Sequence, residues 1–383
     1  MIKSYKIRLY PTKEQEAKMW QHIGACRYIW NWMLAKQEEL YEAGDGRKHL
    51  SGFGMMGLLQ PLKNDGEHEW LYEVSNASLQ TVCRDLDDAY KRFFKKQNGF
   101  PKFKSRKRSK PNYPVRCNTL YFADDGRVNI EKIGKVKYKT DFDLSIGRGC
   151  KFTNPRISNV NGKWMLSFGM ECENQVFQLN DYNMGIDLGL KDSAIVAYGD
   201  KKLVFHNINK GRKIRSIKQR MKHLQRSISR QYEANRRGNV YVKTKNIERE
   251  EDKLRKLYAR LSNIRNNFIH QSTHALVELL PKRVVMEDLD VVGMMQQNRH
   301  KAEQAQEQKL YEWIRQMKYK CEWRGIEFAQ VNRYYPSSKT CHNCGYIKHD
   351  LKQSDRIYIC PKCGYIEDRD YNAALNLRDT KTT

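Results

Sequence analysis

The sequence predicts a multidomain α+β protein: a helical segment, a small antiparallel β-domain, and a C-terminal α/β domain with a metal-binding insertion. Three observations support this. The spacing of apolar residues changes along the chain from helical to alternating and then to a mixture of both. The 383 residues exceed the size of one typical domain. Two Cys-x-x-Cys pairs lie close together near the C-terminus.

The N-terminal half combines a strand, a helical segment and further strands. Residues 5–10 alternate apolar and basic side chains, as a half-buried strand does. Residues 13–96 place apolar side chains at helical spacing, and the Asn-Gly-Phe-Pro sequence at 98–101 ends this segment. The period becomes two over 121–172. We expect the strand at 5–10 to join this β-domain in a barrel, with the helices inserted between them.

The C-terminal part has an α/β pattern. Strands are predicted at 184–187, 193–205 as a hairpin, 283–286 and 325–331, and a helix at 372–377. Between these strands, two long helices carry apolar residues in a heptad pattern, which indicates a helical hairpin with Gly238 in its turn. The apolar seam consists of Ile214, Ile217, Met221, Leu224 and Ile228 in the first helix and Leu254, Leu257, Leu261, Ile264 and Phe268 in the second.

The charge predicts a polyanionic partner. The chain has 71 Lys and Arg against 44 Asp and Glu, a net charge of +27. Nucleic acid is the usual partner of such a chain, with an acidic membrane surface or an unengaged basic surface as alternatives. No apolar run approaches the roughly 18 residues of a membrane span, and the N-terminus lacks the apolar core of a secretion signal. We therefore expect neither an integral membrane protein nor a secreted one.

Two stretches concentrate the positive charge. Residues 210–230 contain nine Lys or Arg and no acid, and residues 91–110 interleave Lys and Arg with phenylalanines. Such runs are often only solvated faces, or nuclear-import signals in a eukaryote. Here we expect them to contact nucleic-acid backbones, which positions a duplex without reading its sequence. The predicted nucleic-acid-binding residues are Lys91, Arg92, Lys95, Lys96, Lys102, Lys104, Arg106, Lys107, Arg212, Lys213, Arg215, Lys218, Arg220 and Lys222.

The strongest single motif is a pair of cysteine knuckles. Cys341 and Cys344 form the first, Cys360 and Cys363 the second, and fifteen residues separate them. Four thiolates complete a tetrahedron around Zn²⁺ and leave no open position, so we predict one structural zinc, with His342 facing solvent. A chance pairing and a redox dithiol are the alternatives. The other six cysteines are expected to be ordinary reduced thiols: Cys26, Cys83, Cys117, Cys150, Cys172 and Cys321.

Three dispersed carboxylates form a second candidate site. Asp187 and Glu287 lie at predicted strand ends, and Asp370 lies where the last helix begins. Carboxylates placed in this way can converge on two Mg²⁺ or Mn²⁺ ions about 4 Å apart, an arrangement that hydrolyses phosphodiesters. Each acid alone is weak evidence, because an acid at a strand end more often caps or pairs on the surface. The Gly-Ile-Asp-Leu-Gly motif at 185–189 also occurs in sugar kinases and chaperone ATPases, but no second glycine-rich phosphate loop accompanies it.

Together these motifs resemble the TnpB family, nucleases of insertion-sequence transposons that are related to type V CRISPR effectors. The resemblance covers nearly the whole chain, through residues 5–11, 89–94, 100–105, 185–189, 287–289, 337–345 and 368–376. It implies an RNase H-like (RuvC) α/β nuclease domain with a zinc-ribbon insertion, preceded by a wedge β-barrel with a helical recognition insert. The implied boundaries are 1–12 and 99–180 for the wedge domain, 13–98 for the recognition lobe, 181–336 and 365–383 for the nuclease domain, and 337–364 for the zinc-bearing target-nucleic-acid-binding module.

The resemblance also implies an activity. It is cleavage of double-stranded DNA beside a short target-adjacent motif, directed by a transposon-derived guide RNA, with single-strand cleavage once activated. Asp187, Glu287 and Asp370 would be the metal ligands, with Asp370 preferred to Asp368 on the family pattern alone. We expect a monomer bound to one RNA in the prokaryotic cytoplasm, at the nucleoid when engaged. Candidates for reading the adjacent motif include Tyr10, Lys13 and Arg27.

The sequence leaves two other functions open. One is an RNA-guided DNA-binding repressor without nuclease activity, although all three motif acids are present. The other is a transposase that acts directly on DNA. The sequence offers that alternative neither a tyrosine-nucleophile motif nor an end-binding helix-turn-helix.

Overall fold

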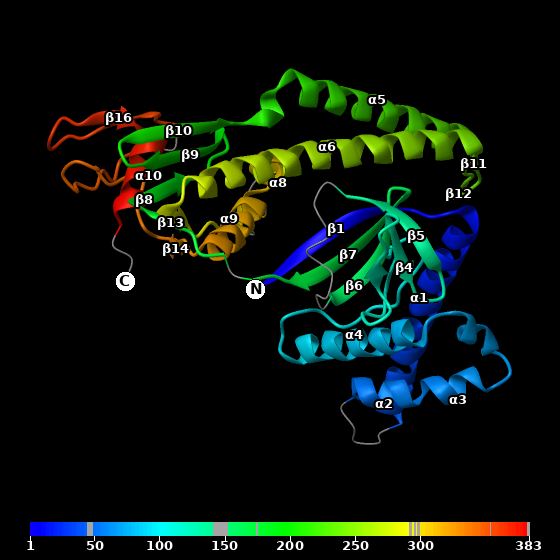
Figure 1. Ribbon diagram of the computed structural model, residues 1–383. Coiled ribbons are helices and arrows are strands. Elements are labelled where there is room, and N and C mark those ends of the chain that lie inside the picture. The colour runs from blue at the N-terminus through cyan, green and yellow to red at the C-terminus, as the bar shows by residue number, and fades with distance from the viewer. Residues whose placement is uncertain are drawn as a thin grey trace. The chain divides into compact units, whose positions relative to one another are not determined.

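The computed structural model describes residues 1–43, 49–140, 152–173, 175–290, 293, 294, 296, 299–352 and 354–380. It divides into two compact units, Met1–Glu173 and Asn174–Thr383 (Figure 1). No helix in these described ranges is long and apolar enough to cross a membrane. Cys150, expected to be an ordinary thiol, lies outside them.

The first unit inserts helices after its first strand, β1 (Ile2–Tyr10), as predicted. Helix α1 begins after Thr12, which forms a capping box with Gln15 that satisfies the backbone N–H groups of both residues. The helices and the sheet share one continuous apolar core. The helical elements are α1 (Lys13–Glu42), α2 (Gly52–Gly57), α3 (Leu59–Lys63), a 3₁₀ turn (Glu69–Glu73) and α4 (Asn76–Phe94).

The β-domain of this unit is a seven-stranded antiparallel sheet in the order β2-β6-β7-β1-β5-β4-β3. Its other strands are β2 (Asn112–Pro114), β3 (Tyr121–Phe122), β4 (Arg127–Ile130), β5 (Gly134–Lys139), β6 (Phe152–Val160) and β7 (Lys163–Glu171). The sheet is rolled, because the ring of Phe122 on the edge strand β3 lies 5.5 Å from that of Phe152 on β6. Among the described strands no hydrogen-bonded ladder joins β2 to β3. The predicted barrel is therefore a rolled sheet with aromatic rings in its interior, and its described edge strands β2 and β3 are not hydrogen-bonded to each other.

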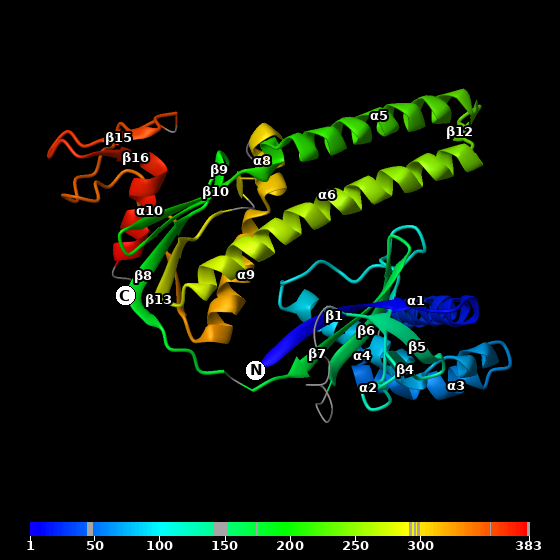
Figure 2. The same cartoon turned by 45° about the horizontal axis from the view of Figure 1, so that its top comes forward.

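The second unit has a five-stranded mixed sheet in the order β10-β9-β8-β13-β14 (Figure 2). Strands β8, β13 and β14 are parallel, whereas β9 and β10 continue from β8 as antiparallel hairpins. The strands are β8 (Asn180–Asp187), β9 (Asp192–Tyr198), β10 (Lys201–His206), β13 (Pro281–Glu287) and β14 (Glu327–Val331). Two short hairpins accompany them: β11 (Arg236–Arg237) with β12 (Val240–Tyr241), and β15 (Ile357–Ile359) with β16 (Ile366–Asp368).

Helices cover both faces of this sheet. Helices α6 (Lys245–Glu278) and α9 (Leu310–Arg324) bury Leu276 and Trp313 against one face. Helix α10 (Arg369–Asp379) packs Ala374 and Leu375 against the other. Helix α8 (Arg299–Gln308) precedes α9, and α5 (Arg212–Ala234) pairs with α6 through the predicted seam of Ile214, Ile217, Met221 and Leu261. Gly238 lies in the turn of that helical hairpin with a positive φ, as predicted.

Helix α10 lies very close to β8 at Gly185. A Cβ atom at this position would overlap backbone atoms of Ala374 and Arg378. Backbone atoms cannot move aside as the tip of a flexible side chain can. Only a glycine therefore allows this close approach of helix and strand.

We expect Gly185→Ala to lower the free energy of unfolding by at least about 1–3 kcal/mol, the cost of overpacking a close approach. Denaturant unfolding of the purified protein measures this. Gly24→Ala in α1 is the matched control, because a Cβ there meets nothing within 4 Å. Alanine is also the better helix former by about 1 kcal/mol, so the control is expected to gain stability. Equal stability of Gly185→Ala and the wild type would contradict the close approach.

Candidate functional site

Strand register brings Asp187 and Glu287 together. Strands β8 and β13 are parallel neighbours in which Ile186 lies opposite Met286, so the next residue of each strand ends it at the same edge of the sheet. Ile186 and Met286 belong to the core beneath α6 and α9. Because side chains alternate between the faces of a strand, Asp187 and Glu287 lie on the opposite face, which α10 covers.

Asp370 enters the same region from the first turn of α10, and its neighbour Asp368 has a different role. Asp368 is the N-cap, and its Oδ1 accepts the N–H groups of Asp370 at 3.1 Å and Tyr371 at 2.9 Å. The carboxylate of Asp370 instead accepts two hydrogen bonds from Arg369, at 2.9 and 2.6 Å, and lies 3.5 Å from Arg356. The family pattern alone favoured Asp370, and the cap now gives a physical distinction between the two acids.

The three carboxyl groups interact electrostatically. Burial, followed by the negative charges of Glu287 and Asp370, raises the pKa of Asp187 well above its usual value. Burial also raises the pKa of Glu287; the hydroxyl of Ser337 opposes that rise and Asp370 adds to it. Holding all three groups ionised is therefore unfavourable without a cation. The two arginines beside Asp370 supply part of this positive charge. Divalent ions that prefer oxygen ligands suit such a set of carboxylates.

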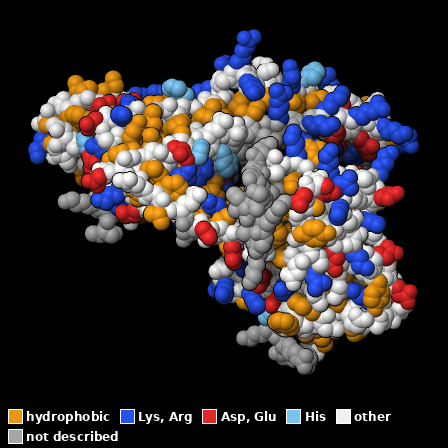
Figure 3. Space-filling view, in the orientation of Figure 1, with side chains coloured by type: hydrophobic (Ala, Val, Ile, Leu, Met, Phe, Trp, Pro, Cys, Tyr) orange, Lys and Arg blue, Asp and Glu red, His pale blue; other side chains and the backbone are white. Residues whose placement is uncertain are grey.

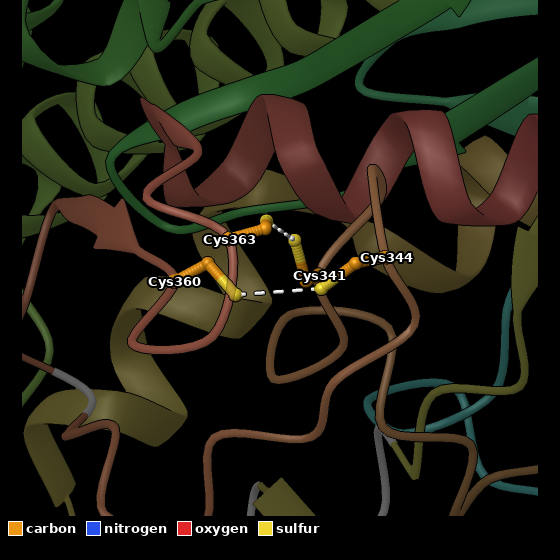
Figure 4. A group of neighbouring side chains, drawn as sticks. All are labelled: Cys341, Cys344, Cys360 and Cys363. Carbon is orange, nitrogen blue, oxygen red and sulfur yellow. Dashed lines mark hydrogen bonds between the residues drawn. The ribbon is translucent and has the colours of Figure 1, made fainter.

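The four cysteines are the most compact candidate metal site. Their Sγ atoms all lie within 4.8 Å of one another, the one such group of three or more ligands among the residues that the structure describes. The three carboxylates are spaced more widely, as ligands of two ions can be. Figure 4 shows the cysteine side chains pointing toward one another, with Sγ separations of 3.6 Å for Cys341–Cys363 and 3.5 Å for Cys344–Cys360. Zn–S bonds of about 2.3 Å require tetrahedral edges of about 3.8 Å, so the residues fit zinc.

Two tight turns produce this convergence. In each knuckle a glycine follows the second cysteine, and its N–H donates to the carbonyl of the first cysteine. The distance is 2.9 Å for Gly345 and 3.0 Å for Gly364. Both glycines have a positive φ, a conformation that glycine adopts without strain. Burial raises the pKa of Cys341 to about 12, whereas the N–H of Tyr365 is the main cause that lowers the pKa of Cys363 to about 6.

Most of the predicted nucleic-acid-binding residues are exposed. Figure 3 shows Lys and Arg side chains gathered over the α5–α6 hairpin. Three predicted residues have partners within the protein. Lys91 pairs with Asp87 at 2.9 Å, and half-buried Lys218 pairs with Glu307. Half-buried Lys104 lies 3.3 Å above the Trp30 ring, and burial lowers its pKa to about 8. The other eleven predicted residues are all exposed: Arg92, Lys95, Lys96, Lys102, Arg106, Lys107, Arg212, Lys213, Arg215, Arg220 and Lys222.

The sequence did not single out a basic cavity in the first unit. It has a volume of about 720 Å³ and is lined by Arg27, Lys104, Lys110 and Arg156 among others. Arg156 is held there by a two-pronged ion pair with Asp85, at 2.7 and 2.9 Å. These residues are far apart in the sequence, so no local pattern indicates the cavity, although Arg27 was a candidate for reading the adjacent motif.

Comparisons with known families agree with this architecture. A model described as "Probable transposase" matches residues 173–299, and one described as "Cas12f1-like, TNB domain" matches 311–377. A third, described as "Helix-turn-helix domain", matches 1–46, where the sequence predicted no such motif. In the described residues 1–43 the structure has the strand β1 followed by the single long helix α1.

Full-length relatives were also found. The chain is 29 % identical to "Putative RNA-guided DNA endonuclease InsQ" of Escherichia coli K12, over 98 % of this chain and 91 % of that protein. It is 28 % identical to "Putative RNA-guided DNA endonuclease" of Streptomyces pristinaespiralis, over 98 % of this chain and 88 % of that protein. Among solved structures, that of a Cas12f1–sgRNA–target DNA complex matches with a TM-score of 0.64 at 14 % identity, covering 100 % of this chain and 99 % of that one.

The fold and the cysteine site define a protein of mixed α+β class with the fold of the Cas12f effectors. The family models and the full-length relatives confirm the similarity to the TnpB family that the sequence indicated.

Proposed function

We propose that this protein is an RNA-guided DNA endonuclease whose catalytic site is Asp187, Glu287 and Asp370. The observation that carries the proposal is the meeting of two parallel strand ends with the first turn of α10, which gathers three mutually interacting carboxyl groups. The strand order, with three antiparallel strands followed by two parallel ones, supports assigning an RNase H-like (RuvC) fold to the second unit. The names of the full-length relatives support guidance by RNA.

The three acids would hold two Mg²⁺ or Mn²⁺ ions. Such ions, when bound, activate the attacking water and stabilise the leaving oxygen of a phosphodiester. The protein's own contribution is positional: the strands β8 and β13 hold two carboxylates rigidly, and α10 supplies the third. Arg369 and Arg356 partly neutralise the carboxylate of Asp370. The cysteine knuckles would hold one structural zinc.

The partners in this proposal are a transposon-derived guide RNA and double-stranded target DNA beside a short motif, bound by a monomer. Single strands would be cut once the complex is activated. We also propose the wedge, recognition, nuclease and zinc-bearing divisions at the boundaries given above, and a place of action at the prokaryotic nucleoid. The exposed basic residues of α5 support a backbone-binding role for that helix, since such contacts carry no base specificity.

The first test is to purify the protein expressed with its native flanking DNA and to sequence the nucleic acid that accompanies it. One defined RNA that extends past the transposon boundary, and cleavage of a DNA matching that RNA, are the expected results. Unrelated host RNA, or DNA alone, would contradict guidance.

A direct transposase is the second candidate, because the family model covering residues 173–299 carries that description. Joining of transposon ends by the protein without RNA would establish it. A guided repressor is the third candidate. Stable DNA binding without cleavage, in the presence of a matched guide, its target and Mg²⁺, would establish that function instead.

The basic face of α5 is expected to bind phosphates. Replacing the exposed residues Lys213, Arg220 and Lys222 by Gln together should weaken binding of guide RNA. A plot of the logarithm of the binding constant against the logarithm of the salt concentration has a negative slope. The magnitude of this slope should fall by roughly 0.7–0.9 for each phosphate that the variant no longer neutralises. Filter binding at several salt concentrations measures both quantities. Replacing Lys91, which is engaged by Asp87, is the control and should change the slope less. An unchanged slope in the triple variant would exclude α5 from the interface.

A further inference from the structure

We infer that Ser337 is a positioning residue for Glu287, and that the first cysteine knuckle fixes Ser337 through two buried asparagines of α10. The role of Ser337 rests on the proposed function of Glu287 as a metal ligand. It explains two parts of the sequence that the carboxylates and cysteines leave unassigned, residues 337–340 and the asparagines that follow Asp370.

Ser337 contacts Glu287 directly. Its side chain is buried, with 2 % of the residue exposed, and its hydroxyl donates a hydrogen bond to Oε1 of Glu287. The terminal torsion of a glutamate is broad, so a carboxylate at the end of a strand is not oriented by its backbone alone. One fixed oxygen restricts this rotation and leaves the other oxygen free for a metal ion. Partners of this kind orient metal ligands in many proteins.

Asn376 in turn holds Ser337. Its amide group donates to the carbonyl oxygens of Ser337 and Thr340, both at 2.7 Å. Only 7 % of Asn376 is exposed, so neither bond is readily replaced by water. The turn that carries the serine is therefore fastened to the helix that carries Asp370.

Asn372, one helical turn earlier, extends this connection to the cysteine site. It is fully buried, donates to the carbonyl of Thr340 at 2.7 Å and accepts the N–H of His342 at 3.0 Å. His342 lies between the two cysteines of the first knuckle. A continuous series of hydrogen bonds thus runs from the knuckle through Asn372, Asn376 and Ser337 to Glu287.

A purely structural role for these bonds would affect stability without affecting metal affinity. The test therefore measures Mn²⁺ binding to the zinc-loaded protein by electron paramagnetic resonance, with binding that persists in Glu287→Ala subtracted. The variants are Ser337→Ala, Ser337→Thr, which keeps the hydroxyl, and Asn376→Ala, which releases the turn. The matched control is Ser338→Ala, since the Ser338 hydroxyl makes no hydrogen bond to another residue that the structure describes. Zinc content and the unfolding midpoint report whether each variant is folded.

We expect Ser337→Ala to keep its zinc and to bind Mn²⁺ about 10-fold or more weakly, with cleavage slowed by about 10–100-fold. Asn376→Ala should show the same direction of change, whereas Ser337→Thr and Ser338→Ala should resemble the wild type. Wild-type Mn²⁺ affinity in folded Ser337→Ala, an equal loss in Ser338→Ala, or no Mn²⁺ binding beyond that of Glu287→Ala would overturn the inference. If the Mn²⁺ pattern holds but no guide supports cleavage by the wild type, the positioning role stands and the proposed nuclease function fails.

Discussion

Replacing Asp187 or Glu287 by Ala is expected to abolish guided DNA cleavage and to leave RNA and DNA binding near wild-type levels. Each acid lies at the end of a buried parallel strand, so its removal changes the metal site without disturbing the exposed basic helix α5. Loss of one well-placed electrostatic group costs about 10²–10³-fold in rate, and loss of a metal ligand should cost at least as much. Single-turnover cleavage with matched guide and target, together with a binding assay, measures both effects.

Two controls make this prediction specific. Asp181 lies at the other end of β8, the strand that carries Asp187, and its side chain is 93 % exposed. Asp181→Ala should therefore cleave DNA at the wild-type rate. Asp370→Ala should be inactive, whereas Asp368→Ala loses a helix cap worth about 1 kcal/mol and should retain part of the activity. Full cleavage by Asp187→Ala or Glu287→Ala would remove that residue from the proposed site.

Local patterns were sufficient to predict the central strands of the second unit, its long helical hairpin and its last helix, but not α8, α9 or the short hairpins β11–β12 and β15–β16. The alternation and helical spacing predicted β8, β13, β14 and the α5–α6 hairpin, because each of these elements buries one face. The cysteine site was predictable for a similar reason: each pair of ligands sits within four consecutive residues, so its spacing is visible in the sequence. The approach of Cys344 to Cys360 confirms the predicted grouping.

Features that depend on long-range packing were not predictable in this way. Asp368 and Asp370 are two residues apart at a helix start, and only the backbone conformation shows which of them caps the helix. The hydrogen bond of Ser337 to Glu287 joins residues fifty positions apart. Likewise, the contact of the Phe122 and Phe152 rings inside the rolled sheet of the first unit joins residues on strands far apart in the sheet, and no periodicity encodes it. The basic run around Lys218 predicted exposure, but the ion pair with Glu307 comes from another helix.

Replacing Cys360 or Cys363 by Ser is expected to remove the zinc and to unfold residues 341–363. Structural zinc sites of this kind contribute an apparent binding free energy of about 10–16 kcal/mol, which the small apolar cluster around Leu351 and Tyr358 cannot supply alone. Elemental analysis should find less than one zinc per chain, and limited proteolysis should cut within 341–363. A chelator would remove Mg²⁺ as well as zinc, so its effect could not be assigned to one metal site. A cysteine substitution affects the zinc site alone.

The same variants test how far the effect of zinc extends. Cys117 is half-buried and outside both knuckles, so Cys117→Ser should keep one zinc and resist proteolysis. Since the first knuckle is bonded to α10 through Asn372, zinc loss should also slow DNA cleavage, even though all three carboxylates are intact. A Cys360→Ser protein that retains one equivalent of zinc would contradict the ligand set. One that loses zinc and cuts at the wild-type rate would show that the knuckle and the carboxylates are independent.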